Sequence, residues 1–125
     1  MEQYADIVDR YLAVWNETDA ARRRELIAQT WADGASYHDP LMQGDGRAGI
    51  DALVQGVHQQ FPGYRFRQAG AVDGHHGYVR FAWELGPEDA PAPIAGSDIG
   101  ILAPDGKLQS VIGFLDRVPT GAAEA

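Results

Sequence analysis

Cysteine is absent from this 125-residue sequence, which excludes disulfides, thiolate nucleophiles and cysteine-ligated metal sites. Long apolar runs are absent too: no stretch approaches the roughly 20 residues that a membrane-spanning helix needs. The N-terminus has neither the basic region nor the apolar core of a signal peptide. We therefore expect a cytoplasmic protein with no membrane partner.

Basic residues are scarce: 10 Lys and Arg stand against 18 Asp and Glu, giving a formal net charge of -8. A surface with this charge repels the phosphate backbone, so we expect no nucleic-acid partner. The one basic run, Arg22-Arg23-Arg24, precedes Glu25 in a predicted helix. We expect it to form a solvated helix face.

Motifs for metals and phosphates are missing as well. The four histidines, His38, His58, His75 and His76, show no H-x-x-x-H or H-E-x-x-H spacing. The sequence also has no glycine-rich phosphate loop and no G-x-S-x-G elbow. We expect no metal and no cofactor.

The composition is that of one globular domain. Hydrophobic residues make up 45% and charged residues 22%, which excludes disordered and fibrous classes, and the length matches a single core. We predict one domain over residues 1–118 and a flexible C-terminal tail over residues 119–125.

Helical periodicity occupies the first half of the chain. An apolar stripe with spacings of three and four predicts a helix over residues 2–16. Asp19 can cap a second helix, with Trp31 on its buried face, that ends near Ala32 because Asp33-Gly34 breaks it. A third helix is predicted from Ile50 to Phe61.

The second half changes to strand periodicity. Four strands are predicted there, at residues 64–72, 78–85, 97–102 and 108–118. A further short strand is predicted in the first half, at residues 35–39, where Pro40 stops it. Asp73-Gly74 and Asp105-Gly106 are predicted hairpin turns. Helices followed by a run of strands favour an α+β fold with helices on one side of a curved, mainly antiparallel sheet.

Asp98 is the first candidate for chemistry. It precedes Ile99-Gly100-Ile101-Leu102, in a strand that looks buried on both faces. An ionised carboxylate there is costly, so a raised pKa and a neutral acid that donates a hydrogen bond are expected. The alternative is an aspartate that accepts local turn hydrogen bonds near Gly96-Ser97.

Asp39 and Tyr11 are the other candidates. Asp39 shares a strand face with Tyr37 while His38 points to the other face, so an inward Asp39 could shuttle a carbon-bound proton. The alternative is that Asp39-Pro40 only begins a turn. Tyr11 belongs to the apolar stripe, where tyrosine is more often core, but its buried hydroxyl needs a partner such as Asp98.

Large apolar side chains could line a pocket near these groups. Phe81 and Trp83 alternate on one strand face, with Arg80 on the other. The candidate pocket-lining residues are Trp15, Trp31, Tyr37, Met42, Phe61, Phe81, Trp83 and Phe114. They favour an apolar ring-bearing ligand, although each is more often simply core.

The ordered set of motifs resembles a known superfamily. Residues 10–16, Trp31-Ala32-Asp33-Gly34, His38-Asp39-Pro40 and Ala92-Pro93-Ile94 are similar to the nuclear transport factor 2-like superfamily, nearest to ketosteroid isomerase and SnoaL-like polyketide cyclases. The resemblance implies a cystatin-like cone enclosing a pocket. It also implies that Asp39 is the base, while Tyr11 and a protonated Asp98 donate to an enolate oxygen.

Three functions follow from this resemblance. The first is a cofactor-independent isomerase or cyclase that moves a proton at a carbon next to a carbonyl. The second is a non-catalytic ligand-binding or accessory domain, and the third is an epoxide hydrolase-like enzyme, which would need an arginine between two carboxylates. We also expect a homodimer through the open sheet face, with Val79, Val111 and Leu115 on its surface.

Overall fold

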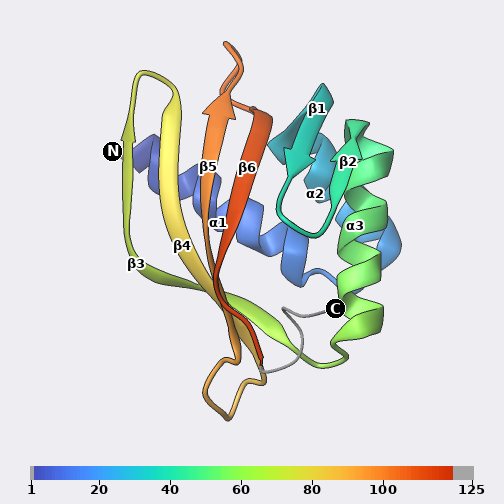
Figure 1. The fold of residues 1–125 in the computed structure, drawn as a ribbon. Helices are drawn as coiled ribbons and strands as arrows, with labels where there is room; N and C mark the ends of the chain where they lie inside the picture. The colour runs from blue at the N-terminus through green and yellow to red at the C-terminus, as the bar shows by residue number, and fades with distance from the viewer. Residues whose placement is uncertain (1, 120–125) are drawn as a thin grey trace.

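The computed structural model describes residues 2–119, so most of the predicted tail lies outside the described residues. Three helices pack on a curved, unclosed, mixed sheet, which confirms the predicted α+β class (Figure 1). The elements are α1 (Glu2–Asn16), α2 (Ala20–Thr30), β1 (Trp31–His38), β2 (Gln43–Asp45), α3 (Gly46–Gln60), β3 (Arg65–His75), β4 (Tyr78–Gly86), β5 (Ile94–Leu102) and β6 (Leu108–Arg117).

The sheet has the order β2-β1-β6-β5-β4-β3. Strands β3 to β6 form an antiparallel meander, whereas β6 pairs with β1 in parallel. The short strand β2, which was not predicted, extends the sheet beyond β1. In Figure 1, α1 passes behind β4, β5 and β6, while α3 lies beside β2.

Helix α1 closes one face of the sheet, as its apolar stripe predicted. The stripe residues are all buried: Tyr4, Ile7, Val8, Tyr11, Leu12 and Trp15. At the end of the helix, the side-chain amide of Asn16 donates to the Phe66 carbonyl at 2.9 Å and accepts from the Phe66 N–H at 2.8 Å. This paired contact fixes the end of α1 against β3.

The predicted end of the second helix was wrong. Helix α2 is capped by Asp19, whose side chain accepts from the Arg22 N–H at 2.8 Å, but it ends at Thr30. Trp31 already belongs to β1, and the register of β1 against β6 shifts between Trp31 and Ser36. Gly34, with φ of +78°, lies inside this irregularity, so the Asp33-Gly34 signal marks a distortion within a strand.

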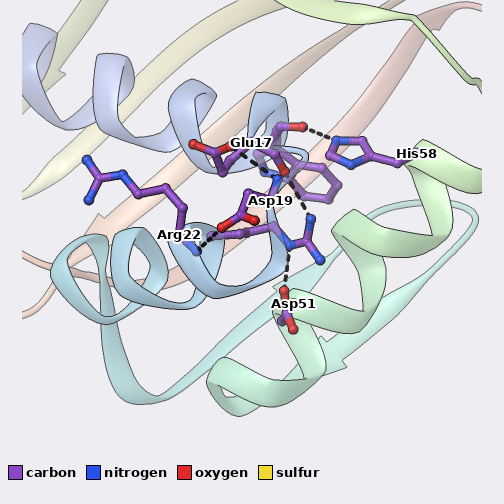
Figure 2. Close-up of polar contacts among 7 residues, drawn as sticks. Glu17, Asp19, Arg22, Asp51 and His58 are labelled. Atoms are coloured by element: carbon purple, nitrogen blue, oxygen red, sulfur yellow. Dashed lines mark hydrogen bonds and ion pairs between the residues drawn. The ribbon is translucent and has the colours of Figure 1, made fainter.

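The basic run is not wholly solvated either. Arg23 is only 3% exposed; its Nε contacts Asp51 Oδ1 of α3 at 2.5 Å and its Nη1 donates to the Glu17 carbonyl at 2.9 Å (Figure 2). The expected solvated face holds for Arg22, which pairs with Glu25 at the surface. Arg23 therefore joins α2 to α3.

The β3–β4 turn is displaced from its predicted position. Asp73 and Gly74 lie within β3, and the chain reverses at His76 and Gly77, which have φ of 51° and 82°. Gly74 is required for packing, because a Cβ there would come within 2.4 Å of the Tyr4 ring. The Asp105-Gly106 turn is as predicted, with φ of 87° at Gly106.

The two faces of the sheet differ sharply in exposure. Val79 and Val111 are 1% and 0% exposed and face the helices, so their predicted place on the open face was wrong. Leu115 also packs against the core. The open face instead carries Ile99 and Phe114, which are 38% and 55% exposed. No helix in the described part of the chain is long and apolar enough to cross a membrane.

Candidate functional site

Asp98 lies on the helix-facing side of β5 and is 1% exposed. The next residue, Ile99, faces the open side, so the strand is buried on one face only and not on both as predicted. Around Asp98 the sheet is lined with glycine: Gly96 and Gly100 flank it on β5, and Gly113 is its partner on β6. These glycines leave room for the side chains that cover the carboxyl group.

Two buried donors hold the Asp98 carboxyl group. The Tyr11 hydroxyl donates to Oδ2 at 2.5 Å, and the Trp83 indole N–H donates to Oδ1 at 3.0 Å. Burial raises the pKa of Asp98 to about 6, while the hydrogen bonds from Trp83 and Tyr11 oppose that rise and the charge of Asp39 adds to it. Asp98 thus changes protonation near neutral pH.

Asp39 is held in a different way. Its Oδ2 accepts from the Tyr37 hydroxyl at 2.7 Å, which confirms that these side chains share a face, and His38 is exposed on the other side. Its Oδ1 accepts from the backbone N–H groups of Leu41 and Met42 at 2.8 and 2.9 Å. The sequence offered two alternatives for Asp39, a turn or an inward side chain, and the structure shows both together.

The Asp98 carboxyl group and the Asp39 side chain both approach Gly113. A Cβ built on this glycine would lie 2.8 Å from Asp98 Oδ1, 3.3 Å from Asp39 Cβ and 3.4 Å from the Tyr37 hydroxyl. These side chains therefore fill the space above Gly113, so that only glycine fits at this position. The structure thus brings Tyr11, Asp39 and Asp98 into one cluster, together with Tyr37, although they are far apart in sequence.

Both tyrosines in the cluster remain protonated donors at neutral pH. Burial, followed by the charge of Asp98, raises the pKa of Tyr11 well above its ordinary value. The pKa of Tyr37 is raised by burial and then by the charges of Asp98 and Asp39. Neither hydroxyl can serve as a base in this state.

Aromatic rings enclose the cluster on the helix side. Trp15, Trp31 and Phe81 surround Tyr11, with ring centroids 6.2, 5.8 and 5.1 Å away. Phe66 was not predicted to line the site, although it packs between Trp15 and Trp83 at 5.5 and 5.3 Å. The sequence offered one signal that Phe66 lines the site: it lies at the start of a predicted strand, just after the turn that follows α3.

The remaining predicted lining residues lie farther out. Met42 and Phe61 are partly buried against the core, and Phe61 stacks on Tyr64 with centroids 5.3 Å apart. Phe114 was predicted wrongly: it is 55% exposed on the open face. Its neighbour Gly113 takes the inward position, where a bulky side chain would collide with Asp98.

Open hollows occur away from this cluster. One of about 570 Å³ is bordered by Asp9, Asn16 and Arg65, and another of about 390 Å³ lies beside Gly77 and Leu102. Neither hollow is lined by a residue of the cluster. A ligand-sized pocket at the cluster itself therefore remains a prediction. Within residues 2–119, no three His, Asp or Glu side chains gather to hold a metal ion.

Comparisons with known proteins agree with this architecture. Residues 8–111 match the family model of the SnoaL-like domain. A SnoaL-like family protein from Agrobacterium tumefaciens, provisionally named an isomerase, is 46% identical; the match covers 93% of this chain and 99% of that one, with a TM-score of 0.89.

More distant structures share the fold. A SnoaL-like protein of unknown function from Burkholderia thailandensis is 14% identical over 92% of this chain and 96% of its own, with a TM-score of 0.72. A Jannaschia protein provisionally named a SnoaL-like polyketide cyclase is 15% identical over 92% and 86%, with a TM-score of 0.70. No curated protein matches the sequence. The chain belongs to the SnoaL-like domain family, within the nuclear transport factor 2-like fold.

Proposed function

We propose that this protein is a cofactor-independent enzyme that moves a proton at a carbon next to a carbonyl, through an enolate, as an isomerase or a cyclase does. The observation that carries this proposal is the Asp98 carboxyl group, buried and held by the Tyr11 hydroxyl and the Trp83 N–H. A carboxylate whose pKa lies near the working pH suits proton abstraction, because it can accept a proton and release it again.

Asp98 is the better placed of the two carboxylates for the role of base. A carboxylate oxygen has two lone-pair sites, and the single donor on each Asp98 oxygen leaves lone pairs free. At Asp39, only Oδ2, which accepts from the Tyr37 hydroxyl, keeps a free lone pair, because Oδ1 already accepts two backbone N–H groups.

This assignment reverses the roles that the family resemblance implied. In those roles Asp39 is the base, and Tyr11 and a protonated Asp98 both donate to an enolate oxygen. The short Tyr11–Asp98 contact directs the hydroxyl toward the carboxylate, an arrangement that supports an ionised Asp98 near neutral pH. Asp39 then anchors the turn and adds negative charge beside Asp98.

The test is exchange of the protons next to the carbonyl of 2-tetralone in deuterated water, followed by proton NMR. The native protein is expected to accelerate the exchange and Asp98→Asn to abolish the acceleration, because an amide cannot accept the proton. Loss with Asp39→Asn alone would return the role of base to Asp39. No acceleration by the native protein would reject the enolate chemistry for this substrate class.

A non-catalytic ligand-binding domain is the second candidate. It is favoured by the burial of Asp98, because a carboxyl group that is closed off from its surroundings is hard for a reacting carbon to reach. A protein of this kind would bind ring-bearing ligands without accelerating the exchange of their protons. The hydrolase candidate has less support: Arg80 lies on the open face with a side chain 70% exposed, paired with Asp73 rather than held between Asp39 and Asp98.

The apolar open face supports pairing of two copies. Tyr78, Ile99 and Phe114 are 49%, 38% and 55% exposed on adjoining strands, and such a patch is typical of an interface. Sedimentation is expected to show a dimer that Phe114→Arg dissociates. A single 13.6 kDa species at high concentration would contradict this assembly.

A further inference from the structure

The indole N–H of Trp15 is a buried donor with no acceptor. Trp15 is 3% exposed, and its Nε1 has no hydrogen-bond partner among the described residues. An unpaired buried donor is unfavourable, so its retention needs a physical reason. The other polar side chains of the cluster are paired: Tyr11 with Asp98, Trp83 with Asp98 and Tyr37 with Asp39.

The Trp15 ring lies at the cluster, between its two tyrosines. Its centroid is 6.2 Å from that of Tyr11 and 5.5 Å from that of Tyr37. The Trp15 ring therefore packs against both tyrosines whose hydroxyls donate to the acidic groups.

The backbone and ring of Trp15 are both held in place. The Trp15 carbonyl, at the end of α1, is 2.7 Å from His58 Nε2, and His58 reaches it from α3 in Figure 2. The Phe66 ring packs against the indole, with centroids 5.5 Å apart. A donor fixed in this way loses little freedom when an acceptor arrives, which is the condition for a pre-organised binding group.

We infer that Trp15 Nε1 donates a hydrogen bond to a carbonyl or enolate oxygen of the ligand. The tyrosine hydroxyls and the Trp83 N–H are already engaged by carboxylates, so Trp15 supplies the donor that recognises the ligand oxygen while Asp98 accepts the proton. The site would then select ligands with a ring and one oxygen acceptor. This inference rests on the proposed function, since it assumes that a ligand reaches the cluster.

Trp31 provides a matched control. Its indole N–H is likewise buried without a partner, and its ring centroid is 5.8 Å from that of Tyr11. However, Trp31 lies at the start of β1, and only Trp15 stands between Tyr11 and Tyr37. Trp31→Phe and Trp15→Phe remove the same atoms from the same core, so their effects on packing should be similar.

The experiment measures binding of 2-naphthol, a planar enol mimic, and of 2-methylnaphthalene, which has the same shape without the oxygen. Trp15→Phe is expected to weaken 2-naphthol binding about tenfold, equivalent to about 1.4 kcal/mol, and 2-methylnaphthalene binding less than about twofold. Trp31→Phe is expected to affect the two compounds equally, because it changes packing around the site without removing a donor to the ligand oxygen. Equal weakening of both compounds by Trp15→Phe, or an oxygen-dependent loss with Trp31→Phe, would overturn the role of Trp15.

A second readout follows the indole N–H itself. In nitrogen-15 NMR spectra, the Trp15 resonance, assigned by its absence in Trp15→Phe, should move downfield when 2-naphthol is added and stay in place with 2-methylnaphthalene. If 2-naphthol binds and the Trp15 signal is unmoved, the inference is wrong although the ligand site stands. If the native protein binds neither compound, the site for ring-bearing ligands and the role of Trp15 fall together.

Discussion

The cluster contains two tyrosine–aspartate pairs that differ in how the chain builds them. Tyr37 and Asp39 are two residues apart on one strand end, and Asp39 is half-buried and held by two backbone N–H groups. Tyr11 and Asp98 are 87 residues apart, joined across the core by a 2.5 Å contact. One pair is made by local geometry and the other by the whole fold.

The difference teaches which carboxylate the protein keeps ready for chemistry. The backbone N–H groups that donate to Asp39 fix a turn. An aspartate that holds a turn in this way is common at strand ends in proteins of every function. Burying Asp98 brings an energetic cost that folding alone gives no reason to retain. Buried groups that lower the stability of the fold and have no structural role are typical of active sites.

The largest expected contrast is in catalysis. Asp98→Asn should lower the exchange rate of 2-tetralone by about a thousandfold, within the range for loss of a general base, whereas Asp39→Asn should lower it by less than about tenfold. Proton NMR in deuterated water gives both rates. Equal losses in the two variants would show that the pairs act as one unit.

The pH dependence sharpens the same contrast. If ionised Asp98 is the base, the rate should rise about tenfold per pH unit below its pKa of about 6 and level off above it. If a protonated Asp98 donates a hydrogen bond instead, the rate should fall as the pH rises through the same value. The sign of the slope therefore decides between the two assignments.

Stability should change in the opposite order to activity. The folded-state pKa of Asp98 is raised from 3.8 to about 6, so the native protein loses about 3 kcal/mol of stability as the pH rises between these values and none above them. Asp98→Asn should remove this dependence and stabilise the protein by about 2 kcal/mol in mildly alkaline buffer.

Asp39→Asn provides the control for that measurement. It should lower the free energy of unfolding by about 1 kcal/mol, because the Tyr37 hydroxyl loses its carboxylate acceptor. Urea unfolding at acidic and alkaline pH gives both values. A less stable Asp98→Asn variant at alkaline pH would mean that the carboxylate is a structural asset.

The smallest expected effect compares the two hydroxyl groups. Tyr11→Phe removes a hydrogen bond that lowers the pKa of Asp98, so the rise in the pH–rate profile should move to higher pH. Tyr37→Phe, which leaves that bond intact, should leave the position of the rise in place. A profile that shifts equally in both variants would contradict the separation of the pairs.

Local periodicity made most of the fold predictable. The apolar stripe of α1 and the alternation along β4 depend on neighbouring residues, and both were read correctly. The parallel pairing of β1 with β6 depends on residues about 75 positions apart, for example Ser36 and Ser110, and leaves no local signal. The three-residue strand β2 is too short to show a period.

The site was only partly predictable for a related reason. Hydrophobicity assigned Phe114 to the inner face of β6. In the structure, the inward position belongs to the neighbouring Gly113, because the side chains of Asp98, Asp39 and Tyr37 already fill that space. The same preference for bulky residues concealed Gly113. It also concealed the unpaired donor of Trp15, because only the assembled core reveals which donors lack acceptors.

The central position of β6 has a consequence for how the chain is made. On the ribosome, β1 is synthesised long before β6, yet β6 is its neighbour in the sheet and separates it from β5. Until β6 emerges, the edges of β1 and β5 are both unpaired and able to join strands of other chains. Nascent protein should therefore need the most chaperone protection just before this strand leaves the exit tunnel.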